Sequence, residues 1–484
     1  MTTKNLRNVC LMGHSSSGKT TLAENMLYTT GAIDRQGRTP DGNTVCDYDP
    51  EEIKRQISIS AAIAPINYGG CKINVLDCPG FFDFAGETMS ATRAAEAGII
   101  FCSAKDGIAV GAERAWKRLK KINMPTLFYI SKTDEEHGDF ASVLSALQEK
   151  YGSSVCAAAC PTSDGMGVID LVHNVAYITS GGKTTTANIP AADADTAESL
   201  REALMESAAG ADEALMEKYF EDMTLSEEDI VKGLKLGVAD RSVMPVFCGA
   251  AISGIGTECL LKAIVDYVPD PSEVEGIDPN GPTVGFVFKT ISDQFGKYSF
   301  VKIMSGSLSS DMSLQDVRTG STDKLGRLYT MCGKKNTEVK SAVCGDIVAV
   351  GKMEWKSGDT VCDPKADVEL PPIEMPEPCY SMAVRPKVKG QDDKVAMGLN
   401  RLNEEDSSFK VVNNAETKQL VLSGVGDIHL DVLCSKLKAR FGVEAELFPA
   451  RVPYREKIKA KVEAHGRHKK QPGGSAQFGA GWSR

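Results

Sequence analysis

The chain has 484 residues, of which 42% are hydrophobic and 25% are charged, and its formal net charge is −10. These values are close to the average for globular proteins, so large cores can form, and the length predicts three or four domains. No apolar run approaches the roughly 18 residues that span a bilayer, and the N-terminus lacks the apolar segment of a signal peptide. We therefore expect a cytoplasmic protein and neither a membrane-spanning nor a secreted one.

The 14 cysteines are scattered along the chain, mostly within apolar runs, and no CxxC pair occurs. Cys156 and Cys160 are the closest pair. Because disulfide frameworks and zinc sites show regular, close spacing, we predict reduced cysteines in the cores of the domains.

The first motif along the chain is a phosphate-binding loop. It fits the pattern GxxxxGK[ST] with Gly13, His14, Ser15, Ser16, Ser17, Gly18, Lys19 and Thr20. An expected strand at residues 9–12 precedes it and an expected helix at residues 21–28 follows it, which is the setting that this motif requires. The N–H groups of such a loop surround the β-phosphate of a nucleotide, Lys19 reaches the β- and γ-phosphates, and the Thr20 hydroxyl binds Mg²⁺. Thr21 completes the nucleotide-binding residues at this loop.

A second motif, Asp77-Cys78-Pro79-Gly80, ends the apolar run at residues 73–76. An Asp at the end of a strand can hold Mg²⁺, usually through water, and a glycine three residues later lets its N–H approach the γ-phosphate. Alone, this pattern more often marks an ordinary turn. Beside a phosphate-binding loop, the motif predicts that Asp77 binds the metal and the nucleotide. It also predicts that Gly80 acts in catalysis together with Lys19.

A third motif, Ser131-Lys132-Thr133-Asp134, follows the expected strand at residues 126–130. The carboxylate of Asp134 can accept hydrogen bonds from N1 and N2 of guanine, a donor pair that adenine lacks, so this residue would select GTP. Alone, KxD is a weak signal, and a solvated turn is more common. The order of the three motifs, each at a strand end, predicts a GTPase domain and disfavours an unrelated ATPase or kinase.

The organisation of the first domain follows from the pattern of its elements. Strands and helices alternate from residue 6 to about 155, which is typical of a parallel α/β sheet. Segment 191–230 then carries thirteen acidic residues against Arg201 and Lys218, with helical spacing. We therefore expect a GTP-binding domain at residues 1–275 with a helical insert at about 156–243.

Two further domains are expected after the break at Pro269-Asp270-Pro271. Short alternating strands punctuated by glycines predict a β-barrel domain at residues 281–370. Beyond a proline cluster, the order β-α-β-β-α-β predicts a ferredoxin-like α+β domain at residues 376–450, in which His429 is structural.

Residues 451–470 reverse the charge of the chain, with eight Lys and Arg against Glu456 and Glu463. A basic stretch in an acidic chain fits contact with RNA phosphates, and a solvated charged surface is the alternative.

With these motifs the chain resembles translation elongation factor G, and more closely the elongation-factor-G-like branch, from Leu6 to about Gln477. The resemblance implies a first switch segment at Asp49–Ile59, in which the Ser58 hydroxyl binds Mg²⁺ where the family has Thr; the alternative is an ordinary strand residue. It also implies a fifth nucleotide motif at residues 245–251, whose N–H groups near Gly249 and Ala250 contact the guanine carbonyl. The implied cofactors are GTP or GDP and Mg²⁺.

Three positions depart from the family pattern. Phe81 stands where the family has a His that helps to orient the attacking water, and a Phe side chain cannot hydrogen-bond water. Ser131 replaces an Asn, which removes an amide that braces the nucleotide site, and Ser16 replaces an Asp. We therefore expect slow GTP hydrolysis, or hydrolysis driven by a group that the ribosome supplies.

The end of the chain resembles the opening of the family's fourth domain at residues 465–479 and then leaves the pattern. We expect residues 451–484 to be a truncated start of this domain. We therefore do not expect this chain to catalyse translocation efficiently. Beyond Glu456 we expect disorder, because the partner strands are missing.

Three hypotheses for the function follow. The leading one is a ribosome-associated translational GTPase, acting in elongation or ribosome recycling. The second is a GTP-dependent ribosome-binding switch with negligible hydrolysis, for which Phe81 is the reason. The third is a ribosomal protection factor of the tetracycline-resistance type, a group that residues 104–107 resemble but that keeps the His. The implied partners are ribosomal RNA and, at the insert, the stalk proteins; a plain helical decoration is the alternative for the insert. We expect no membrane contact and a monomer.

Overall fold

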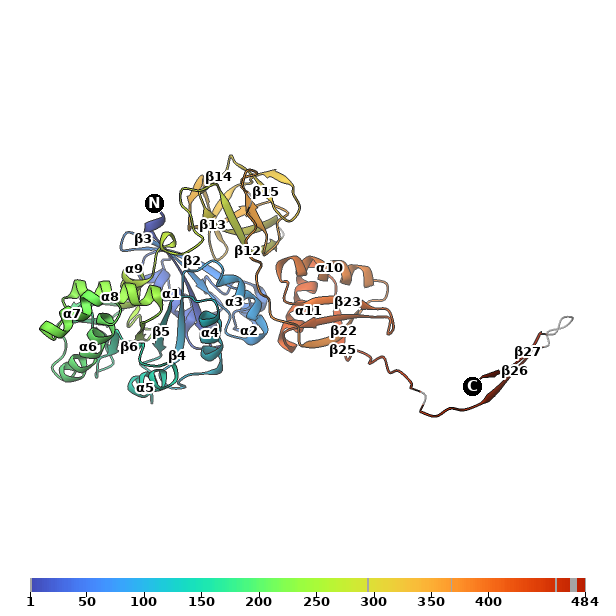
Figure 1. Cartoon of the computed structure of the whole chain (residues 1–484), viewed down its shortest axis with the longest axis horizontal. Coiled ribbons are helices and arrows are strands. Elements are labelled where there is room, and N and C mark those ends of the chain that lie inside the picture. The colour runs from blue at the N-terminus through green and yellow to red at the C-terminus, as the bar shows by residue number, and fades with distance from the viewer. Residues whose placement is uncertain (1, 294–295, 367, 458, 471–476, 484) are drawn as a thin grey trace.

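The computed structural model describes residues 2–293, 296–366, 368–457, 459–470 and 477–483. Along the chain it forms an α/β domain with a helical extension, a β-rich domain, an α+β domain and an extended segment that ends in a hairpin (Figure 1). Within these residues no helix is both long and apolar enough to cross a bilayer.

The first domain is built on a seven-stranded sheet with the order β2-β3-β1-β4-β5-β11-β6. Its strands are β1 (Leu6–Gly13), β2 (Ala62–Tyr68), β3 (Cys71–Asp77), β4 (Ala97–Ser103), β5 (Thr126–Ser131), β6 (Val155–Ala157) and β11 (Met244–Gly249). All neighbouring pairs are parallel except β2 with β3. β4 and β5 are buried along their whole length, which explains their continuous apolar sequences.

Six helices accompany this sheet: α1 (Lys19–Thr29), α2 (Pro50–Arg55), α3 (Ala85–Ala91), α4 (Val110–Lys121), α5 (Phe140–Tyr151) and α9 (Thr257–Tyr267). The three motif segments and the predicted fifth nucleotide motif lie at the carboxyl ends of β1, β3, β5 and β11. Parallel strands present these ends at one edge of a sheet, so the topology gathers all four segments there.

A second group of elements lies between β6 and β11 in the sequence. It contains a four-stranded sheet of β7 (Ala159–Pro161), β8 (Gly167–Asp170), β9 (Val175–Ser180) and β10 (Lys183–Ala187), followed by α6 (Ala194–Ala209), α7 (Glu213–Asp222) and α8 (Glu227–Asp240). α8 begins with a capping box of Ser226 and Asp229, and the acidic residues of its first turn match the positive end of the helix dipole. The helices of this insert extend from one end of the sheet (Figure 1).

The β-rich domain is a curled eight-stranded antiparallel sheet with the order β16-β15-β21-β12-β13-β20-β17-β18. Its strands are β12 (Val284–Asp293), β13 (Gly296–Ser305), β15 (Ser313–Asp316), β16 (Thr322–Lys324), β17 (Leu328–Cys332), β18 (Lys335–Val339), β20 (Ile347–Gly351) and β21 (Thr360–Cys362), with a separate pair, β14 (Ser307–Ser309) and β19 (Ser341–Val343). The sheet wraps around an apolar core that includes the fully buried Trp355.

The α+β domain has the predicted element order. It consists of β22 (Tyr380–Pro386), α10 (Asp392–Glu405), β23 (Lys410–Asn414), β24 (Gln419–Gly424), α11 (Asp427–Phe441) and β25 (Ala445–Phe448). The sheet order β23-β24-β22-β25 places the first and third strands in the centre, as the ferredoxin-like fold requires. Leu399 of α10 and Leu433 of α11 belong to its core.

The expected disorder beyond Glu456 is wrong for two segments. β26 (Ala464–Lys470) and β27 (Gln477–Ser483) form an antiparallel hairpin that stands away from the other domains (Figure 1). The two strands satisfy each other's backbone hydrogen bonds, which an isolated strand could not do. Residues 471–476, part of the segment that resembles a fourth domain, lie outside the described residues.

Buried charges join the β-rich domain to the first domain. Lys302 Nζ lies 2.5 Å from Glu96 Oε1, and Asn8 also donates to Glu96 at 2.6 Å. Lys72 pairs with Asp346 at 2.7 Å. Because breaking such a buried pair costs about 3–5 kcal/mol, these contacts fix how the two domains dock.

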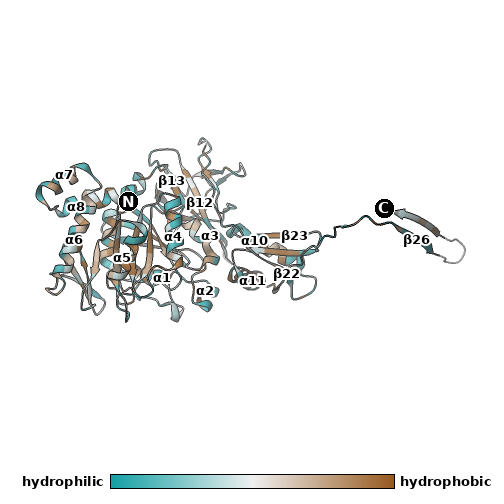
Figure 2. Cartoon of the chain, turned by 60° about the horizontal axis from the view of Figure 1, so that its bottom comes forward, coloured by the Kyte–Doolittle hydropathy of each residue, from teal (hydrophilic) through white to brown (hydrophobic). Residues whose placement is uncertain are grey.

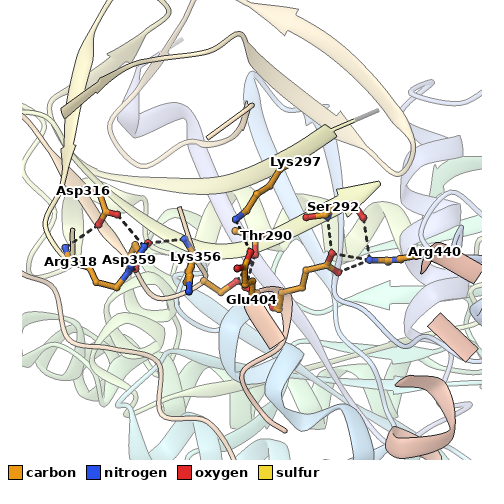
Figure 3. Close-up of polar contacts among 11 residues, drawn as sticks. Thr290, Ser292, Lys297, Asp316, Arg318, Lys356, Asp359, Glu404 and Arg440 are labelled. Atoms are coloured by element: carbon orange, nitrogen blue, oxygen red, sulfur yellow. Dashed lines mark hydrogen bonds and ion pairs between the residues drawn. The ribbon is translucent and has the colours of Figure 1, made fainter. Parts of the chain in front are cut away.

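Polar contacts also join the β-rich domain to the α+β domain (Figure 3). Arg440 of α11 pairs with Glu405 at 2.7 Å, and Glu405 accepts a hydrogen bond from the Ser292 amide at 3.0 Å. Lys297 reaches Glu404 at 3.5 Å. The end of β12 and the start of β13 are therefore bound to the ends of α10 and α11.

Candidate guanine-nucleotide site

The phosphate-binding loop connects β1 to α1 through two positions whose backbone favours glycine. Gly13 and Gly18 have φ of 144° and 92°, and a Cβ at Gly13 would lie 2.9 Å from the carbonyl oxygen of Phe101. The Lys19 side chain is buried and folds back over the loop, where its Nζ donates to the His14 carbonyl at 2.7 Å. Burial lowers the pKa of the Lys19 ammonium, and the nearby Asp77 carboxylate opposes this shift.

The three predicted metal-binding residues meet at the start of α1. Thr20 Oγ1 donates to Asp77 Oδ2 at 2.6 Å and lies 3.1 Å from Ser58 Oγ. Burial, followed by the charge of Asp47, raises the pKa of the Asp77 carboxyl to about 7. A cation beside these oxygens would favour the charged form.

Asp47 is a further carboxylate at this place. It is buried, its pKa is raised by burial, and hydrogen bonding to Ser58 and the charge of Lys19 oppose the rise. The buried atoms Asp47 Oδ2, Asp77 Oδ1 and Ser17 Oγ have no hydrogen-bond partner among the described residues. Oxygen donors, carboxylates above all, are the ligands that Mg²⁺ prefers, so this set fits the ion.

Residues 44–60, here called switch I, are held in place by Glu52. Asp49 and Glu52 form a capping box that starts α2. The Glu52 carboxylate also accepts hydrogen bonds from the amides of Ile59 and Ser60, at 2.9 and 3.0 Å. Burial, with the charge of Asp47, raises the pKa of this carboxyl to about 7. These contacts turn Ser58 toward Thr20.

Residues 77–91, here called switch II, pass directly beside the phosphate-binding loop. A Cβ at Gly80 would lie 2.6 Å from the Ser15 amide nitrogen and 2.7 Å from Lys19 Nζ. Only glycine therefore lets the backbone come this close to the loop.

Phe81 lies in an apolar cluster rather than in a polar site. Its half-buried ring packs against the buried cluster of Ile59 of switch I, Phe84 and Val432 of α11, against which Ile57 and Ile428 also pack. The cluster joins both switches to the α+β domain.

Polar contacts reinforce this junction. Asp83 Oδ1 accepts a hydrogen bond at 3.1 Å from the amide of His429, in the first turn of α11. A Cβ at Gly426 would lie 2.1 Å from the same oxygen. Arg55 of switch I pairs with Asp431 of α11 at 2.5 Å.

His429 is buried, as expected of a structural residue. Its Nδ1 accepts from the Val425 amide at 3.3 Å, and its Nε2 lies 3.0 Å from Asp406 Oδ2. Burial alone would raise the pKa of Asp406, but hydrogen bonds from His429 and Ser408 lower it to about 2.

The residues predicted to bind guanine lie after β5 and β11. Ser131 Oγ donates to the carbonyl of Ser17 at 2.7 Å and lies 3.1 Å from that of Cys102. The predicted loss of bracing at this position therefore needs correction, because the hydroxyl itself holds the phosphate-binding loop. Lys132 has a φ of 61°, and the Asp134 side chain is exposed.

The fifth motif needs a second correction. The Ala250 amide already donates to the Ile255 carbonyl at 2.9 Å, so it is not available to guanine. The Gly249 carbonyl accepts from the Thr133 amide at 3.3 Å, which joins the two guanine-side segments. The amide of Ala251, the next residue, has no partner among the described residues and is the better donor.

Sequence reasoning missed Asp47 and Asp83. Asp47 lies two residues before the switch segment expected at Asp49–Ile59, outside every sequence motif, and only the folding of switch I brings it to Ser58 and Lys19. Asp83 contacts a helix 346 positions further along the chain, so no local pattern could mark it. The 14 cysteines form no disulfide among the described residues, and all but three are buried, which agrees with the prediction that they lie in the cores.

The chain matches three models of known domain families. Residues 4–270 match the elongation factor Tu GTP binding domain, residues 282–364 match elongation factor G domain 2, and residues 375–449 match elongation factor G, domain III.

Similar proteins agree with these matches. Elongation factor G 1 of Synechocystis sp. (strain ATCC 27184 / PCC 6803 / Kazusa) is 34% identical over 497 residues, which cover 98% of this chain and 71% of that protein. The crystal structure of ttk003000868 from Thermus thermophilus superposes with a TM-score of 0.90 at 33% identity, over 99% of this chain and 72% of that one. The chain therefore belongs to the elongation factor G family of translational GTPases.

Proposed function

We propose that the chain binds GTP or GDP with Mg²⁺ at this site and hydrolyses GTP slowly, as a ribosome-associated factor in translation elongation or ribosome recycling. The observation that carries the proposal is the meeting of Lys19, Thr20 and Asp77 with the oxygens of Ser58 and Asp47 behind one phosphate-binding loop. Elongation factor G 1 is the curated relative that supports the ribosomal role.

Each part of the ligand has residues that fit it. Thr20 and Ser58 would hold Mg²⁺ through their hydroxyls, and Asp77 and Asp47 through water. When bound, Mg²⁺ offsets negative charge on the β- and γ-phosphate oxygens. Lys19 leaves the His14 carbonyl and binds the same phosphates, which explains why a buried ammonium is kept at this place.

The guanine end selects the base. Asp134 would accept from N1 and N2 of guanine, while the Ala251 amide donates to its carbonyl oxygen. The hydrogen bond from Ser131 to the Ser17 carbonyl holds the phosphate-binding loop in place beside the guanine-binding segment. Adenine offers no donor pair to Asp134 and no carbonyl to Ala251, so ATP should bind poorly.

The rate of hydrolysis depends on Gly80 and Phe81. The Gly80 amide is close enough to the loop to meet a γ-phosphate. Phe81 brings no hydrogen-bonding group to the attacking water, and its ring is held in the apolar cluster. Because a positioned acid or base contributes about 10²–10⁴-fold, intrinsic turnover should be slow, and a group from the ribosome should raise it.

A GTP-dependent switch with negligible hydrolysis is the second candidate. It is favoured by the same apolar cluster, in which Phe81 closes both switches onto α11 without offering a group to water. In such a switch the γ-phosphate would order the switch segments, and its loss would release them.

The expected partners also have supporting features. Phe220 and Met223, at the end of α7, are 71% and 69% exposed, which suits contact with a stalk protein. The basic residues 451–470 are exposed where described and suit RNA phosphates. We propose that the protein acts as a monomer in the cytoplasm.

Binding of fluorescent GTP and ATP analogues tests the proposal. The wild-type chain should bind the GTP analogue in the presence of Mg²⁺ and lose most affinity in EDTA. Asp134→Asn should weaken GTP binding by about 10-fold or more, because it removes charged hydrogen bonds of about 1.5–3 kcal/mol. Glu136→Gln, which removes an exposed carboxylate two residues away, is the matched control. Equal affinity for ATP and GTP would contradict the proposal.

A further inference from the structure

Helix α4 has a basic outer face that none of the roles above uses. Its twelve residues include five cations and one carboxylate, Glu113, although the whole chain is acidic. Glu113 pairs with Lys150 of α5. Arg118 and Lys121 share one carboxylate, that of Glu374, at 3.5 and 2.6 Å.

Three cations of this face form no ion pair in the described part of the chain, although Lys117 interacts electrostatically with Glu113, about one turn before it. Arg114, Lys117 and Lys120 are exposed and make no ion pair among the described residues. Their spacing of three residues places them along one side of the helix, over about 9 Å. The charged residues of α4 appear teal in Figure 2.

The basic face begins at the nucleotide site. The guanidinium carbon of Arg114 lies 3.6 Å from the centre of the Phe82 ring, and this ring, in switch II, is 47% exposed. A Cβ at Gly111, in the first turn of α4, would lie 2.4 Å from Cα of His14. The helix therefore contacts both the phosphate-binding loop and switch II.

We propose that the outer face of α4 binds RNA phosphates and that the stack of Arg114 on Phe82 passes this contact to switch II. The inference rests on the proposed function, which makes the ribosome the partner. Arg114 is then a positioning residue for switch II, and Lys117 and Lys120 supply affinity. An arginine on an aromatic ring at the end of a row of lysines suits a phosphate backbone, because the guanidinium can bind phosphate while it stays stacked.

The composition of the face favours RNA over an acidic protein. Protein interfaces have an apolar centre, often with aromatic anchors, whereas nucleic-acid interfaces are polar and positively charged. Val110 is the one large hydrophobic side chain of α4 that is exposed, and it lies at the end of the helix. Trp116 points inward and packs on Phe128 and Tyr151.

A binding experiment tests the surface. The full chain carrying Lys117→Gln and Lys120→Gln would be compared with the wild type on purified ribosomes and on protein-free ribosomal RNA, over a series of salt concentrations. Lys389→Gln with Lys394→Gln is the matched control, since these lysines of the α+β domain are exposed and unpaired in the described residues. The α4 variant should bind both probes more weakly, and the slope of log K against log salt should fall by about 1.4–1.8, because two phosphate contacts are lost.

The other outcomes overturn the inference in distinguishable ways. An equal loss of affinity in the control variant would mean that the effect comes from the net charge of the chain and not from the α4 surface. Weaker binding to ribosomes but unchanged binding to RNA would assign the surface to a ribosomal protein. If the wild type binds ribosomes in a GTP-dependent way and the α4 variant binds them equally well, the role of α4 is overturned and the proposed function stands. A wild type that binds neither probe would overturn the proposed function as well.

A second measurement tests the connection to switch II. Ribosomes should change the rate at which a fluorescent GTP analogue leaves the wild-type chain. Arg114→Gln should abolish this change at saturating ribosomes, and Arg114→Lys, which keeps a cation over Phe82, should restore part of it. The same ribosome-dependent change in all three proteins would overturn the role of Arg114.

Discussion

Asp83 of switch II caps a helix of another domain, and its replacement should loosen the nucleotide site from the α+β domain. The carboxylate accepts the His429 amide at 3.1 Å in the first turn of α11. Gly426 leaves room for it, since a Cβ there would lie 2.1 Å from the carboxylate oxygen. Asp83 thus contributes both a hydrogen bond and a negative charge at the positive end of α11.

The expected magnitude follows from these two contributions. Asp83→Asn keeps an acceptor oxygen and loses the charge, which should cost about 0.3–1 kcal/mol. Asp83→Ala loses both, which should cost about 1–2 kcal/mol, the upper part of the range for removal of a helix N-cap. Since 1.4 kcal/mol is a factor of ten, the alanine variant should open the start of α11 about 5–30 times more often.

Hydrogen exchange at residues 425–433, followed in the presence of a non-hydrolysable GTP analogue, measures this opening. Exchange should rise in the order wild type, Asp83→Asn, Asp83→Ala. Asp392→Asn is the control, because it removes an exposed carboxylate from the first turn of α10, whereas Asp83 bonds to the first turn of α11. If the alanine variant exchanges at the wild-type rate, the Asp83 contact does not hold α11 and the reasoning is refuted.

Three further results are expected. Ser131→Ala should weaken GTP binding by about 2–10-fold, measured by fluorescent nucleotide titration, because loss of the bond to Ser17 costs about 0.5–1.5 kcal/mol; unchanged affinity would show that the hydroxyl does not brace the loop. Without Mg²⁺ and nucleotide, thermal stability should fall as pH rises from about 4 to 7, because the raised pKa values of Asp77 and Glu52 make the folded chain hold protons that the unfolded chain has lost; addition of Mg²⁺ and GDP should reduce this fall, and a flat profile would contradict it. Phe81→His should raise ribosome-stimulated GTP hydrolysis by about 10–100-fold, at or below the low end of the usual range for a positioned acid or base because the surrounding cluster is apolar; an unchanged rate would mean that Phe81 is not limiting.

Much of the site could be predicted because its residues lie in short segments fixed by strand ends. The phosphate-binding loop, Asp77 and Gly80, and Ser131 to Asp134 are each marked by local spacing and by the apolar strand before them. The topology of a parallel sheet then brings these segments to one edge. The element order of the α+β domain was predictable because each segment shows the hydrophobic spacing of a helix or of a strand.

The remaining features depend on contacts between distant parts of the chain. Asp47 reaches the metal-binding oxygens because Glu52 folds switch I, and the Ser131 hydroxyl replaces an amide because Ser17 lies within 2.7 Å. The apolar surroundings of Phe81 come partly from switch I and partly from α11, about 350 residues later. Spacing within one segment carries no information on such neighbours, so they appear only in the folded chain.

The most direct test of the account is GTP hydrolysis by this chain with and without purified ribosomes, with ATP as the control nucleotide. The account predicts slow hydrolysis of GTP alone, a clear increase with ribosomes, and no ribosome-dependent hydrolysis of ATP. ATP hydrolysis equal to that of GTP would contradict it. So would the absence of both ribosome stimulation and GTP-dependent ribosome binding.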